Sequence, residues 1–547
     1  MMGYAMGYMQ GAGEIADVTG WQVGPFVQDD WKFRPNLTIN LGLRWDPNTP
    51  PTSYNGRGAA WVPGKNTVAG FANSAPGQQS TVFANAPAGL LFPGDPGVPN
   101  TLMNSDYGYW EPRVGMAWQP RFLPHTVVHS GFGIFTGPLQ YSEYNHAADV
   151  APFSPTFSFT GWCGACWGSS PLQAVPFDNP WASLNASPSS NPFPGTFPWA
   201  SLAYKPAKNV AIPKGQVGQS FSRDFKLPTT YAWNFSIEHQ LTPTTAIRAA
   251  YVGNETDHLS VLVDMNPEWA SKIPVNGAIG DIYDDQSWAT ASYNSLQISL
   301  EQHPWHGLQV QSSFAWSHTL DITGTSNVSY GNPALGNPIS AAWNRGNSSA
   351  DVPWSWITNG IYQAPSFRDK GKLMEETVGG WQLSGIVTLQ TGSPFGIGQW
   401  NSDPGVGMWN DRADFTGQPV NMGKGNHWDW VNPNKGYFNE AAFTDPFASG
   451  HTTSCADKTP GWCGFGNTSK NAYFGPGVFG INASIMKNWT LPEGKAFQFR
   501  WDAFNATNHP NFSGPSSTVN QAAGTFGVIS GINGQPRYFQ GALRLTF

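Results

Sequence analysis

Four cysteines, in two pairs that are close in sequence, have the spacing that most directly suggests chemistry. Cys163 and Cys166 form a CxxC sequence, and Cys455 lies shortly before Cys463. A CxxC redox site requires a thioredoxin-like βαβ context, which the surrounding sequence lacks. A four-cysteine zinc site is an alternative, although the second spacing is wide for it. We favour two local disulfides, Cys163–Cys166 and Cys455–Cys463, that staple loops in an oxidising compartment.

Carboxylates and histidines give little indication of catalysis or metal binding. Asp29 and Asp30 are adjacent, and neighbours in a strand face opposite ways, so we expect them to cap the end of a strand or turn. Asp284 and Asp285 lie in a predicted loop, where a weak cation site is conceivable. The 11 histidines form no HExxH motif, and no GxSxG or P-loop sequence occurs. We therefore predict no enzyme, no catalytic residue, no metal site and no cofactor.

Tryptophan is frequent, with 26 residues, and many of these lie in predicted loops. Exposed indoles stack on flat ligands such as sugars and form binding hot spots. The alternative is that they pack the loops together or form an aromatic girdle at a membrane interface. The loop group comprises Trp162, Trp167, Trp181, Trp199, Trp343, Trp354, Trp356, Trp409, Trp428 and Trp430. The ligand-binding residues are unknown, and the weak candidates within this group are Trp162, Trp167, Trp343, Trp409 and Trp428.

The elements that must position these residues alternate between tight turns and long loops. Segments of alternating apolar and polar residues are joined in pairs by tight turns at 34–36, 241–244, 304–307 and 491–494. The pattern predicts about fourteen strands, near residues 1–10, 20–34, 36–47, 109–120, 124–137, 229–241, 244–254, 293–303, 307–319, 352–365, 379–391, 476–490, 494–506 and 537–547. The longest loops, near 48–108, 138–228 and 392–475, are expected to be functional or disordered.

The strand predicted at 37–45 shows which side chains share a face. Alternation places Leu37, Ile39, Leu41, Leu43 and Trp45 on one side, and Thr38, Asn40, Gly42 and Arg44 on the other. Short turns at one end, long loops at the other and an apolar face opposite a polar face are typical of outer-membrane β-barrels. We therefore expect the apolar set to face lipid and the polar set to face the lumen.

The last predicted strand repeats this design. Phe539, Gly541, Leu543, Leu545 and Phe547 alternate with Gln540, Ala542, Arg544 and Thr546. A terminal Phe in register with the apolar face resembles the signal by which the barrel assembly machinery recognises its substrates. We assign Phe539, Leu543, Leu545 and Phe547 to this signal.

Composition agrees with a membrane barrel. Charged residues make up 12% of the chain, against about 25% in soluble domains, and aromatics make up 14%. The sequence has no run of 18 apolar residues, so we predict no transmembrane helix. Without helices, a closed antiparallel β-barrel is the way to satisfy backbone hydrogen bonds in hydrocarbon. The net charge of −7 argues against nucleic acid as a partner.

Several short sequence stretches resemble the C-terminal barrel of Oar-like TonB-dependent receptors. They occur in the same order as in that family, from about residue 20 to the end. They are FVQDDW at 26–31, NLTINLGLR at 36–44, EPRVG at 111–115, GFGIF at 131–135, YVGN at 251–254, YNSLQ at 293–297, GWQLSG at 380–385 and FNATNHPNF at 504–512. The resemblance implies a 22-stranded barrel with a plug and an N-terminal regulatory-like domain, and no segment of 1–547 matches these two parts. The N-terminus also lacks the features of a secretory signal. We therefore expect residues 1–547 to be the C-terminal portion of a longer receptor.

The expected function is active transport across the outer membrane, through a ligand-gated barrel that takes up an unidentified substrate. The expected partners are outer-membrane lipid, the barrel assembly machinery, an unknown extracellular ligand and, through the missing N-terminal part, the TonB complex. Two alternatives stay open: a passive porin, if the strands close alone, and a surface adhesion or interaction protein that acts through its long loops.

Overall fold

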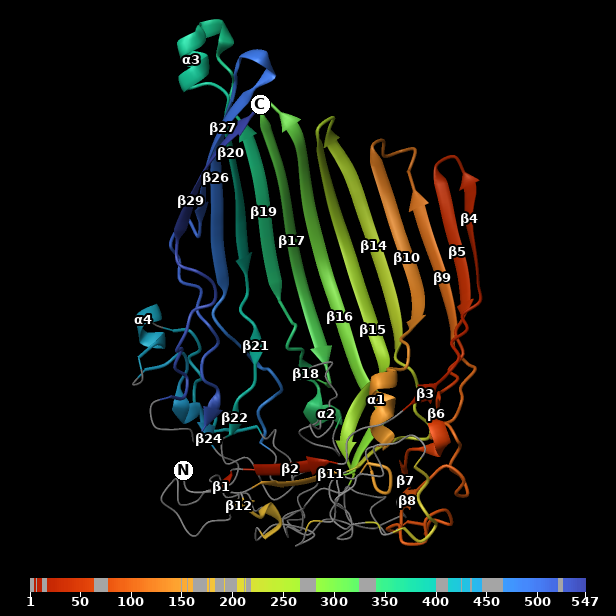
Figure 1. Ribbon diagram of the computed structural model, residues 1–547. Coiled ribbons are helices and arrows are strands. Elements are labelled where there is room, and N and C mark those ends of the chain that lie inside the picture. The colour runs from red at the N-terminus through yellow and green to blue at the C-terminus, as the bar shows by residue number, and fades with distance from the viewer. Residues whose placement is uncertain are drawn as a thin grey trace.

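A computed structural model of the chain shows one dominant antiparallel sheet with smaller folded segments gathered at one end (Figure 1). The structure describes residues 4–5, 7–11, 17–62, 77–148, 150–154, 156–160, 175–176, 178–182, 191, 204–210, 212, 218–265, 282–323, 341–399, 412–424, 426–432, 435–444, 466–519 and 525–547.

The main sheet has 15 strands, of which β13 (Gly218–Phe221) and β18 (Gly346–Asn347) branch off its path. The other thirteen run in chain order across the sheet, each hydrogen-bonded to the next. They are β4 (Phe26–Arg34), β5 (Leu37–Trp45), β9 (Trp110–Trp118), β10 (Thr126–Thr136), β14 (Thr229–Thr242), β15 (Thr245–Asp264), β16 (Ile282–Trp305), β17 (Leu308–Asp321), β19 (Trp354–Gln363), β20 (Trp381–Gln390), β26 (Val478–Thr490), β27 (Ala496–Phe504) and β29 (Tyr538–Thr546).

Short strands and helices fill the connections. The short strands are β1 (Tyr4–Ala5), β2 (Gly7–Gly11), β3 (Val18–Thr19), β6 (Thr52–Ser53), β7 (Ala60–Trp61), β8 (Leu90–Leu91), β11 (Thr156–Thr160), β12 (Val175–Pro176), β21 (Pro394–Phe395), β22 (Gly398–Gln399), β23 (Asp414–Phe415), β24 (Phe443–Thr444), β25 (Tyr473–Phe474) and β28 (Thr518–Val519). The helices are α1 (Tyr141–Asn145), α2 (Ala341–Asn344), α3 (Lys372–Thr377), α4 (His427–Trp430), η1 (Tyr54–Gly56), η2 (His146–Ala148), η4 (Pro180–Ala182), η6 (Arg368–Lys370), η7 (Glu440–Ala442) and η8 (Pro492–Gly494). None of these helices is both long enough and apolar enough to cross a membrane.

Tight turns lie at one end of the sheet, the turn end, and long connections at the other, the loop end (Figure 1). At the turn between β16 and β17, His306 and Gly307 both have positive φ, 48° and 84°. Positive φ at both central positions is the conformation whose twist matches an antiparallel hairpin. An added Cβ at Gly307 would lie 2.2 Å from the carbonyl oxygen of Gln363, so the neighbouring strand also requires glycine there. The predicted alternation of short turns and long loops is confirmed, except at the connection between β19 and β20, residues 364–380, which is long and lies at the turn end.

The strand predicted at 1–10 is wrong as a member of the sheet. Within the described residues, β1 pairs with β12 and β2 pairs with β11, both at the loop end. β2 has five residues, fewer than the roughly 9–11 needed to cross a membrane, and glycines at its ends weaken it as a strand. The other thirteen predicted strands correspond, in chain order, to the thirteen strands of the main path from β4 to β29. Within the described residues, β29 pairs with β27, and no ladder joins β1 or β2 to β29.

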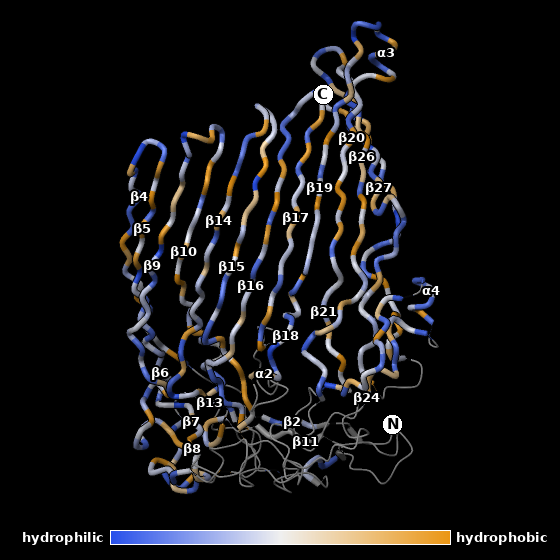
Figure 2. The backbone as a smooth tube through the Cα atoms, turned by 180° about the vertical axis from the view of Figure 1, so that it is seen from behind, coloured by the Kyte–Doolittle hydropathy of each residue, from blue (hydrophilic) through white to orange (hydrophobic). Residues whose placement is uncertain are grey.

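Register across the sheet produces one apolar face and one polar face. Leu41 pairs with Val114, Val114 with Phe132, and Phe132 with Trp233, so one apolar row crosses four strands. Figure 2 shows the corresponding alternation of hydrophobic and hydrophilic residues along the strands. Leu41 is 46% exposed and Leu543 is 71% exposed, because no layer of the described residues covers the apolar face there. Asn40 and Ala542 lie on the opposite face, as predicted.

Buried side chains gather mainly at the loop end and not between layers of sheet. One cluster includes Phe83, Phe92, Phe153 and Ile282, and a second includes Leu102, Met103, Tyr144 and Phe221. A third joins Phe438, Phe443 and Phe526. The described parts of the three long loops are therefore folded around small aromatic cores.

A buried carboxylate orders the first of these loops. Asp95 is 3% exposed and accepts hydrogen bonds from the backbone N–H groups of Thr81, Val82 and Phe92, at 2.6, 3.1 and 2.9 Å. The Ser80 hydroxyl donates to it at 2.7 Å. One carboxylate thus satisfies donors from both ends of residues 80–95 and holds this segment as a compact turn. Buried donors need such partners.

Candidate functional site

The polar face of the sheet is a continuous surface of paired polar side chains. Glu238 of β14 is the register partner of Arg248 of β15, so opposite charges are adjacent. Gln311 of β17 bridges two neighbouring strands, because it donates to Glu301 at 3.5 Å and accepts from Asn359 at 3.4 Å. Such a surface can offer hydrogen bonds to a polar solute at many points.

A pocket of about 520 Å³ opens where this polar face meets the loop end, beside the first strands of the sheet. It is lined by Trp21, Gln22, Val23, Gly24, Arg44, Asp46, Pro47, Asn48, Thr49, Glu111, Arg113, Phe135, Thr136, Gly137, Pro138, Leu139, Tyr141 and Leu227. The charged wall comes from β5, the residue Asp46 that follows it, and β9. The segment before β4, the end of β10 and the residues after it, and Leu227 before β14 supply most of the rest.

Glu111 is the centre of the charged wall. Its side chain is 3% exposed, and it accepts from Arg113 Nη2 at 3.0 Å and from the backbone N–H of Thr136 at 2.8 Å. Arg44 Nε lies 3.9 Å away from the same carboxylate. These contacts follow from register, because Arg44 pairs with Glu111 across β5 and β9. A buried carboxylate is stable when paired and hydrogen-bonded in this way.

Each arginine has a second partner and still faces the pocket. Arg44 donates through Nε and Nη2 to Asp46 Oδ2, at 3.2 and 3.0 Å. The Arg113 guanidinium lies over the Phe135 ring, 4.5 Å from its centroid. The two side chains remain 38% and 48% exposed, so N–H groups are available to a bound molecule.

The segment that precedes β4 covers the pocket closely. Trp21 is 82% exposed, and its carbonyl accepts from the Thr49 hydroxyl at 2.6 Å. An added Cβ at Gly24 would lie 2.2 Å from Arg44 Nη2, so a side chain at this position would displace the guanidinium. Guanidinium donors, carboxylate acceptors and an exposed indole together suit the binding of a polar ligand with a flat or apolar part.

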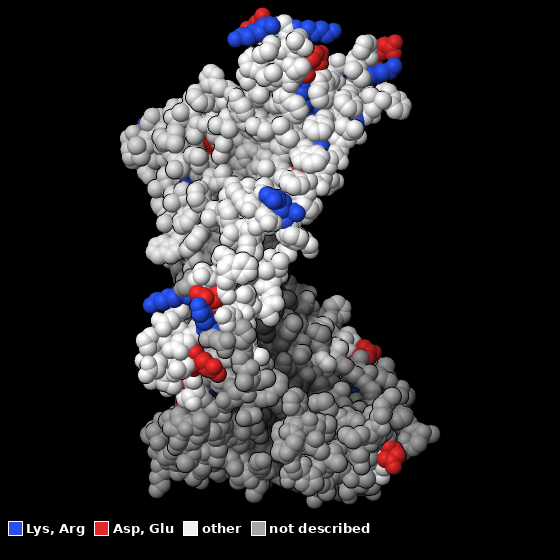
Figure 3. Space-filling view, turned by 90° about the vertical axis from the view of Figure 1, so that its left-hand side faces the viewer, with Lys and Arg blue, Asp and Glu red and all other residues white. Residues whose placement is uncertain are grey.

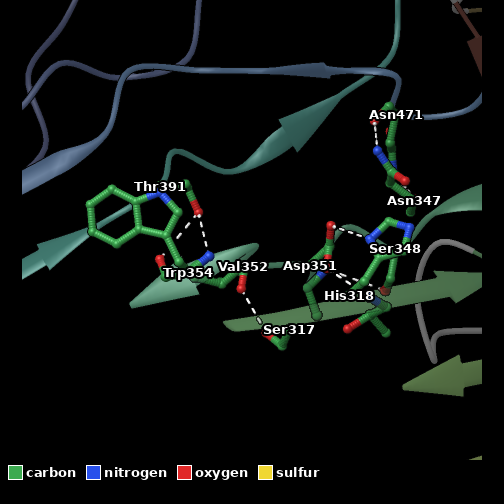
Figure 4. Close-up of polar contacts among 11 residues, drawn as sticks. Ser317, His318, Asn347, Ser348, Asp351, Val352, Trp354, Thr391 and Asn471 are labelled. Atoms are coloured by element: carbon green, nitrogen blue, oxygen red, sulfur yellow. Dashed lines mark hydrogen bonds and ion pairs between the residues drawn. The ribbon is translucent and has the colours of Figure 1, made fainter. Parts of the chain in front are cut away.

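The loop end is fastened to strand β17 by a second group of polar contacts (Figure 4). Asp351 is fully buried, with 0% exposure, and its carboxylate lies 3.2 Å from His318 Nδ1 and accepts from the backbone N–H of Thr319 at 2.7 Å. Asn347 and Asn471 exchange reciprocal side-chain-to-backbone hydrogen bonds of 2.9 Å. These bonds hold two connections that are far apart in sequence against the rim of the sheet.

Asp284 and Asp285 lie in strand β16 and not in a loop, so that prediction is wrong. Strands β15 and β16 continue past the predicted ends, and β13 pairs in parallel with residues 282–285. The carboxylates are 6% and 1% exposed, and accept from the hydroxyls of Ser220 and Ser260, respectively. Burial raises the pKa of Asp284 to about 6. No group of three or more potential metal ligands occurs in the described part of the chain.

Two of the candidate tryptophans lie within the described residues and differ in character. Trp343 packs between loops, because its Nε1 donates to the Gly466 carbonyl at 2.8 Å and the Arg412 guanidinium lies 3.4 Å from its ring centroid. Trp428, in α4, is 72% exposed and remains a candidate for ligand contact. Trp162, Trp167 and Trp409, with the cysteines Cys163, Cys166, Cys455 and Cys463, lie outside the described residues. The ligand roles and disulfides stay predictions.

The sheet shows where three further groups of residues from the sequence analysis lie. Trp354 and Trp356 belong to β19 and lie on the apolar face, not in a loop. Asp29 and Asp30 face opposite ways, as predicted, but they lie within β4 and do not cap its end. Phe539, Leu543 and Leu545 share the apolar face of β29, and Phe547 follows it with 94% exposure. The role of these four residues in assembly stays a prediction.

The sequence pattern does not single out the pocket residues as a site. Arg44, Glu111 and Arg113 had a detectable signal, since each is a charged residue at a polar-face position near one end of a predicted strand. Their convergence depends on the pairing of β5 with β9 and of β9 with β10, which alternation within one strand does not reveal.

The chain is similar in structure to several outer-membrane transport proteins at low sequence identity. With the outer membrane transporter YddB from Escherichia coli it shares 9% identity at a TM-score of 0.43, over 95% of this chain and 44% of that one. With the FrpB iron transporter (F3-3 variant) from Neisseria meningitidis, identity is 10% and the TM-score 0.39, over 96% and 45%. With the siderophore receptor PiuA from Acinetobacter baumannii the values are 8% and 0.38, over 97% and 43%. The chain thus spans less than half the length of these proteins.

No curated protein shows a significant match to this chain. The model of the family described as "Outer membrane beta barrel domain" matches residues 1–540, which is nearly the whole chain. This match agrees with the antiparallel sheet, its apolar and polar faces, and its separate turn and loop ends. The chain belongs to the outer membrane beta barrel domain family and is an outer-membrane protein.

Proposed function

We propose that this chain forms the larger part of the barrel of a TonB-dependent receptor that takes up an unidentified ligand by active transport. The polar face then lines the lumen, the turn end is periplasmic, and the loop end is extracellular. A plug, an N-terminal regulatory-like domain and the contact with the TonB complex belong, in this proposal, to sequence preceding residue 1. The resemblance of the ordered sequence stretches to Oar-like receptors supports the proposal.

The observation that most favours a receptor over a small porin is the direction of the two edge strands. β4 and β29 both run toward the turn end, since thirteen antiparallel strands lie on the path between and including them. Within the described residues, β4 pairs with β5 and β29 with β27, which leaves one edge of each unpaired. Direct closure would pair β4 and β29 in parallel, whereas bacterial outer-membrane barrels have an even number of antiparallel strands.

An odd number of additional strands is therefore needed for antiparallel closure. About nine would complete the 22 strands of plugged outer-membrane transporters. A barrel of that size has a wide lumen that requires a plug to prevent leakage.

The pocket around Glu111 gives the proposal a place for initial ligand contact. It lies on the luminal face at the extracellular end, where an arriving ligand would enter. Arg44 and Arg113 offer N–H donors, and Asp46 offers acceptors. Because the two cations and two carboxylates balance, the pocket suits a polar ligand better than a strongly charged one.

Solute permeability separates the receptor from the porin. We would reconstitute the protein with its upstream reading frame, a variant without the upstream plug region, and the 547-residue chain alone, and measure liposome swelling in small sugars. The receptor requires a sealed barrel that becomes permeable when the plug region is removed. If the 547-residue chain alone forms a stable pore of uniform single-channel conductance, the porin is correct. An impermeable barrel in all three forms, together with loop-dependent cell attachment, would favour the adhesion protein.

A further inference from the structure

The connection between β19 and β20, residues 364–380, is a folded projection at the periplasmic end. It contains η6 and α3 and stands beyond the ends of the strands (Figure 1). The other hairpins at this end, such as those between β14 and β15 and between β16 and β17, close with tight turns. The projection is therefore much longer than joining two antiparallel strands requires.

Three side chains from the apolar face hold the last carbonyls of α3. Trp381 Nε1 donates to the Thr377 carbonyl at 2.9 Å, and Trp489 Nε1 donates to the Glu376 carbonyl at 3.0 Å. Lys487 Nζ donates to the carbonyl oxygens of residues 375 and 379, at 2.9 and 2.5 Å. The unpaired carbonyls at a helix C-terminus need such donors and favour a nearby cation.

The supporting residues place the base of the projection on the lipid side of the barrel. Trp381 and Lys487 are register partners, and their row continues to Phe499 and Leu543 on the apolar face. Lys487 is 2% exposed, and its Nζ lies 5.6 Å and 5.4 Å from the ring centroids of Trp381 and Trp489. Tryptophans in this position are typical of the belt at a membrane–water interface.

The projection itself is amphipathic. Leu373 is 77% exposed, Val378 51% and Met374 37%, which makes an apolar surface on a short helix. Lys370 and Lys372 are exposed next to it. Figure 3 shows charged side chains gathered around this end of the molecule, with few on the middle of the same side.

We propose that residues 366–380 form an interfacial anchor that binds the phospholipids of the periplasmic leaflet. Leu373, Met374 and Val378 enter the boundary between headgroups and acyl chains, and Lys370 and Lys372 bind headgroup phosphates. The end of α3 is bonded to Trp381 and Trp489 of the apolar face, so the projection stands at the edge of the surface that lipid covers. Amphipathic helices bind membranes in this way, with long cationic side chains extending to the headgroups.

This anchor fixes the height of the β19–β27 part of the barrel relative to the leaflet. It is independent of the transport proposal, because it requires a membrane barrel and no ligand. It also explains why a lysine is tolerated on the apolar face: the carbonyl oxygens of residues 375 and 379 accept hydrogen bonds from the Lys487 ammonium, and the projection shields it from lipid.

Site-specific photo-crosslinking in the native outer membrane tests the anchor. A benzophenone amino acid would replace Leu373 in the full-length protein, and Glu493 would be the matched control. Glu493 lies in the neighbouring periplasmic turn and its side chain is 76% exposed. We expect a phospholipid adduct at position 373, at least tenfold more abundant than at 493, by mass spectrometry of the purified protein. A protein adduct at 373, or equal lipid labelling at both positions, would overturn the proposal.

A second measurement avoids dependence on crosslinking chemistry. An environment-sensitive fluorophore on an introduced cysteine at 373 or 493 would be compared in vesicles of phosphatidylethanolamine and phosphatidylglycerol with brominated acyl chains. Quenching at 373 should exceed quenching at 493 several-fold, and K370Q/K372Q should reduce it without changing heat-modifiable migration on gels. Quenching at 373 as low as that of a fluorophore in water would contradict the anchor.

Discussion

Glu111 brings together three groups that are not near one another in sequence: the Arg113 and Arg44 guanidiniums and the Thr136 amide. With 3% exposure, its carboxylate has lost most of its water, so these groups must replace the lost hydrogen bonds. Removing the charge of Glu111 leaves the Arg44 and Arg113 guanidiniums close together, and Arg113 loses its nearest anion. The luminal wall at the pocket depends on this residue.

Replacing Glu111 by Gln tests this dependence. We expect E111Q to lower the free energy of unfolding by about 1–3 kcal/mol, since a charged hydrogen bond is lost while Oε1 still accepts from Thr136. E301Q is the matched control, because Glu301 is an exposed residue of the same face with a 3.5 Å hydrogen bond, and it should cost under about 0.5 kcal/mol. Urea unfolding in lipid vesicles measures both. Equal costs would show that the burial of Glu111 has no energetic consequence.

The lipid-facing assignment is testable at neighbouring residues of β29. Leu543 is 71% exposed on the apolar face and Ala542 faces the lumen. L543R should destabilise the inserted barrel by roughly 2–4 kcal/mol if it lies near the membrane midplane, while A542R should cost much less. At Leu41 the loss of stability would be smaller, because its register partner on the lipid face is Asp29, which can form an ion pair with an introduced arginine. Unfolding in lipid bilayers with equal losses for L543R and A542R would reverse the assignment.

At the scale of elements, the extracellular extension of β15 and β16 is held by buried polar contacts. β13 adds a parallel strand to this extension, and the Ser220 hydroxyl donates to Asp284. Gln286 Nε2 donates to the other carboxylate oxygen at 3.0 Å. Burial disfavours the ionised form and raises the pKa of Asp284 to about 6, even though these hydrogen bonds lower it.

This raised pKa predicts that the extension loses stability as pH increases. The unfolded value is about 3.9, so the folded state binds the proton more tightly. The stabilisation is complete below about pH 4 and is lost as pH rises through 6, by at most on the order of 3 kcal/mol. Hydrogen exchange of residues 218–221 and 282–285, corrected for intrinsic rates, measures it. D284N should abolish the pH dependence, whereas D224N, at an exposed residue nearby, should retain it. A dependence that survives D284N would assign it to another group.

At the scale of the whole molecule, closure of the barrel is the decisive property. Gln28 of β4 and Gln540 of β29 both lie on the luminal face of edge strands. If the proposed additional strands lie between them, each strand adds about 4.8 Å along the sheet and the two side chains do not meet. A small porin would instead place them at neighbouring positions.

Cysteine crosslinking distinguishes the two closures. Q28C/Q540C in the full-length, membrane-inserted protein should form no disulfide, as judged by mass spectrometry of its peptides. Q28C/G42C is the positive control, because Gln28 and Gly42 are register partners and a Cβ at Gly42 fits, with its nearest neighbour 3.7 Å away. Efficient Q28C–Q540C bonding would show direct closure of the present strands and would favour the porin.

The sequence by itself determined the strands of the sheet, their two faces and the separation of short turns from long loops. Successive side chains of a strand point to opposite faces. Because one face meets lipid and the other the lumen, apolar and polar residues alternate along the sequence with a period of two. This is why the faces of Leu41 and Asn40, or of Leu543 and Ala542, were predictable. Residues 1–10 show the same local pattern, yet the described strands there, β1 and β2, pair at the loop end, because alternation does not specify a partner.

Only the tertiary structure revealed the pocket, the extension in which β13 pairs with β16, and the contacts that hold the projection containing α3. Each depends on contacts between residues distant in sequence: Glu111 with Thr136, Asp284 with Ser220, and Lys487 with residues 375–379. The burial of a carboxylate or an ammonium group is a property of what surrounds it, and those surroundings come from strand register and loop packing. A charged residue in a strand therefore reveals its face from the sequence, while its partners and its pKa follow from the fold.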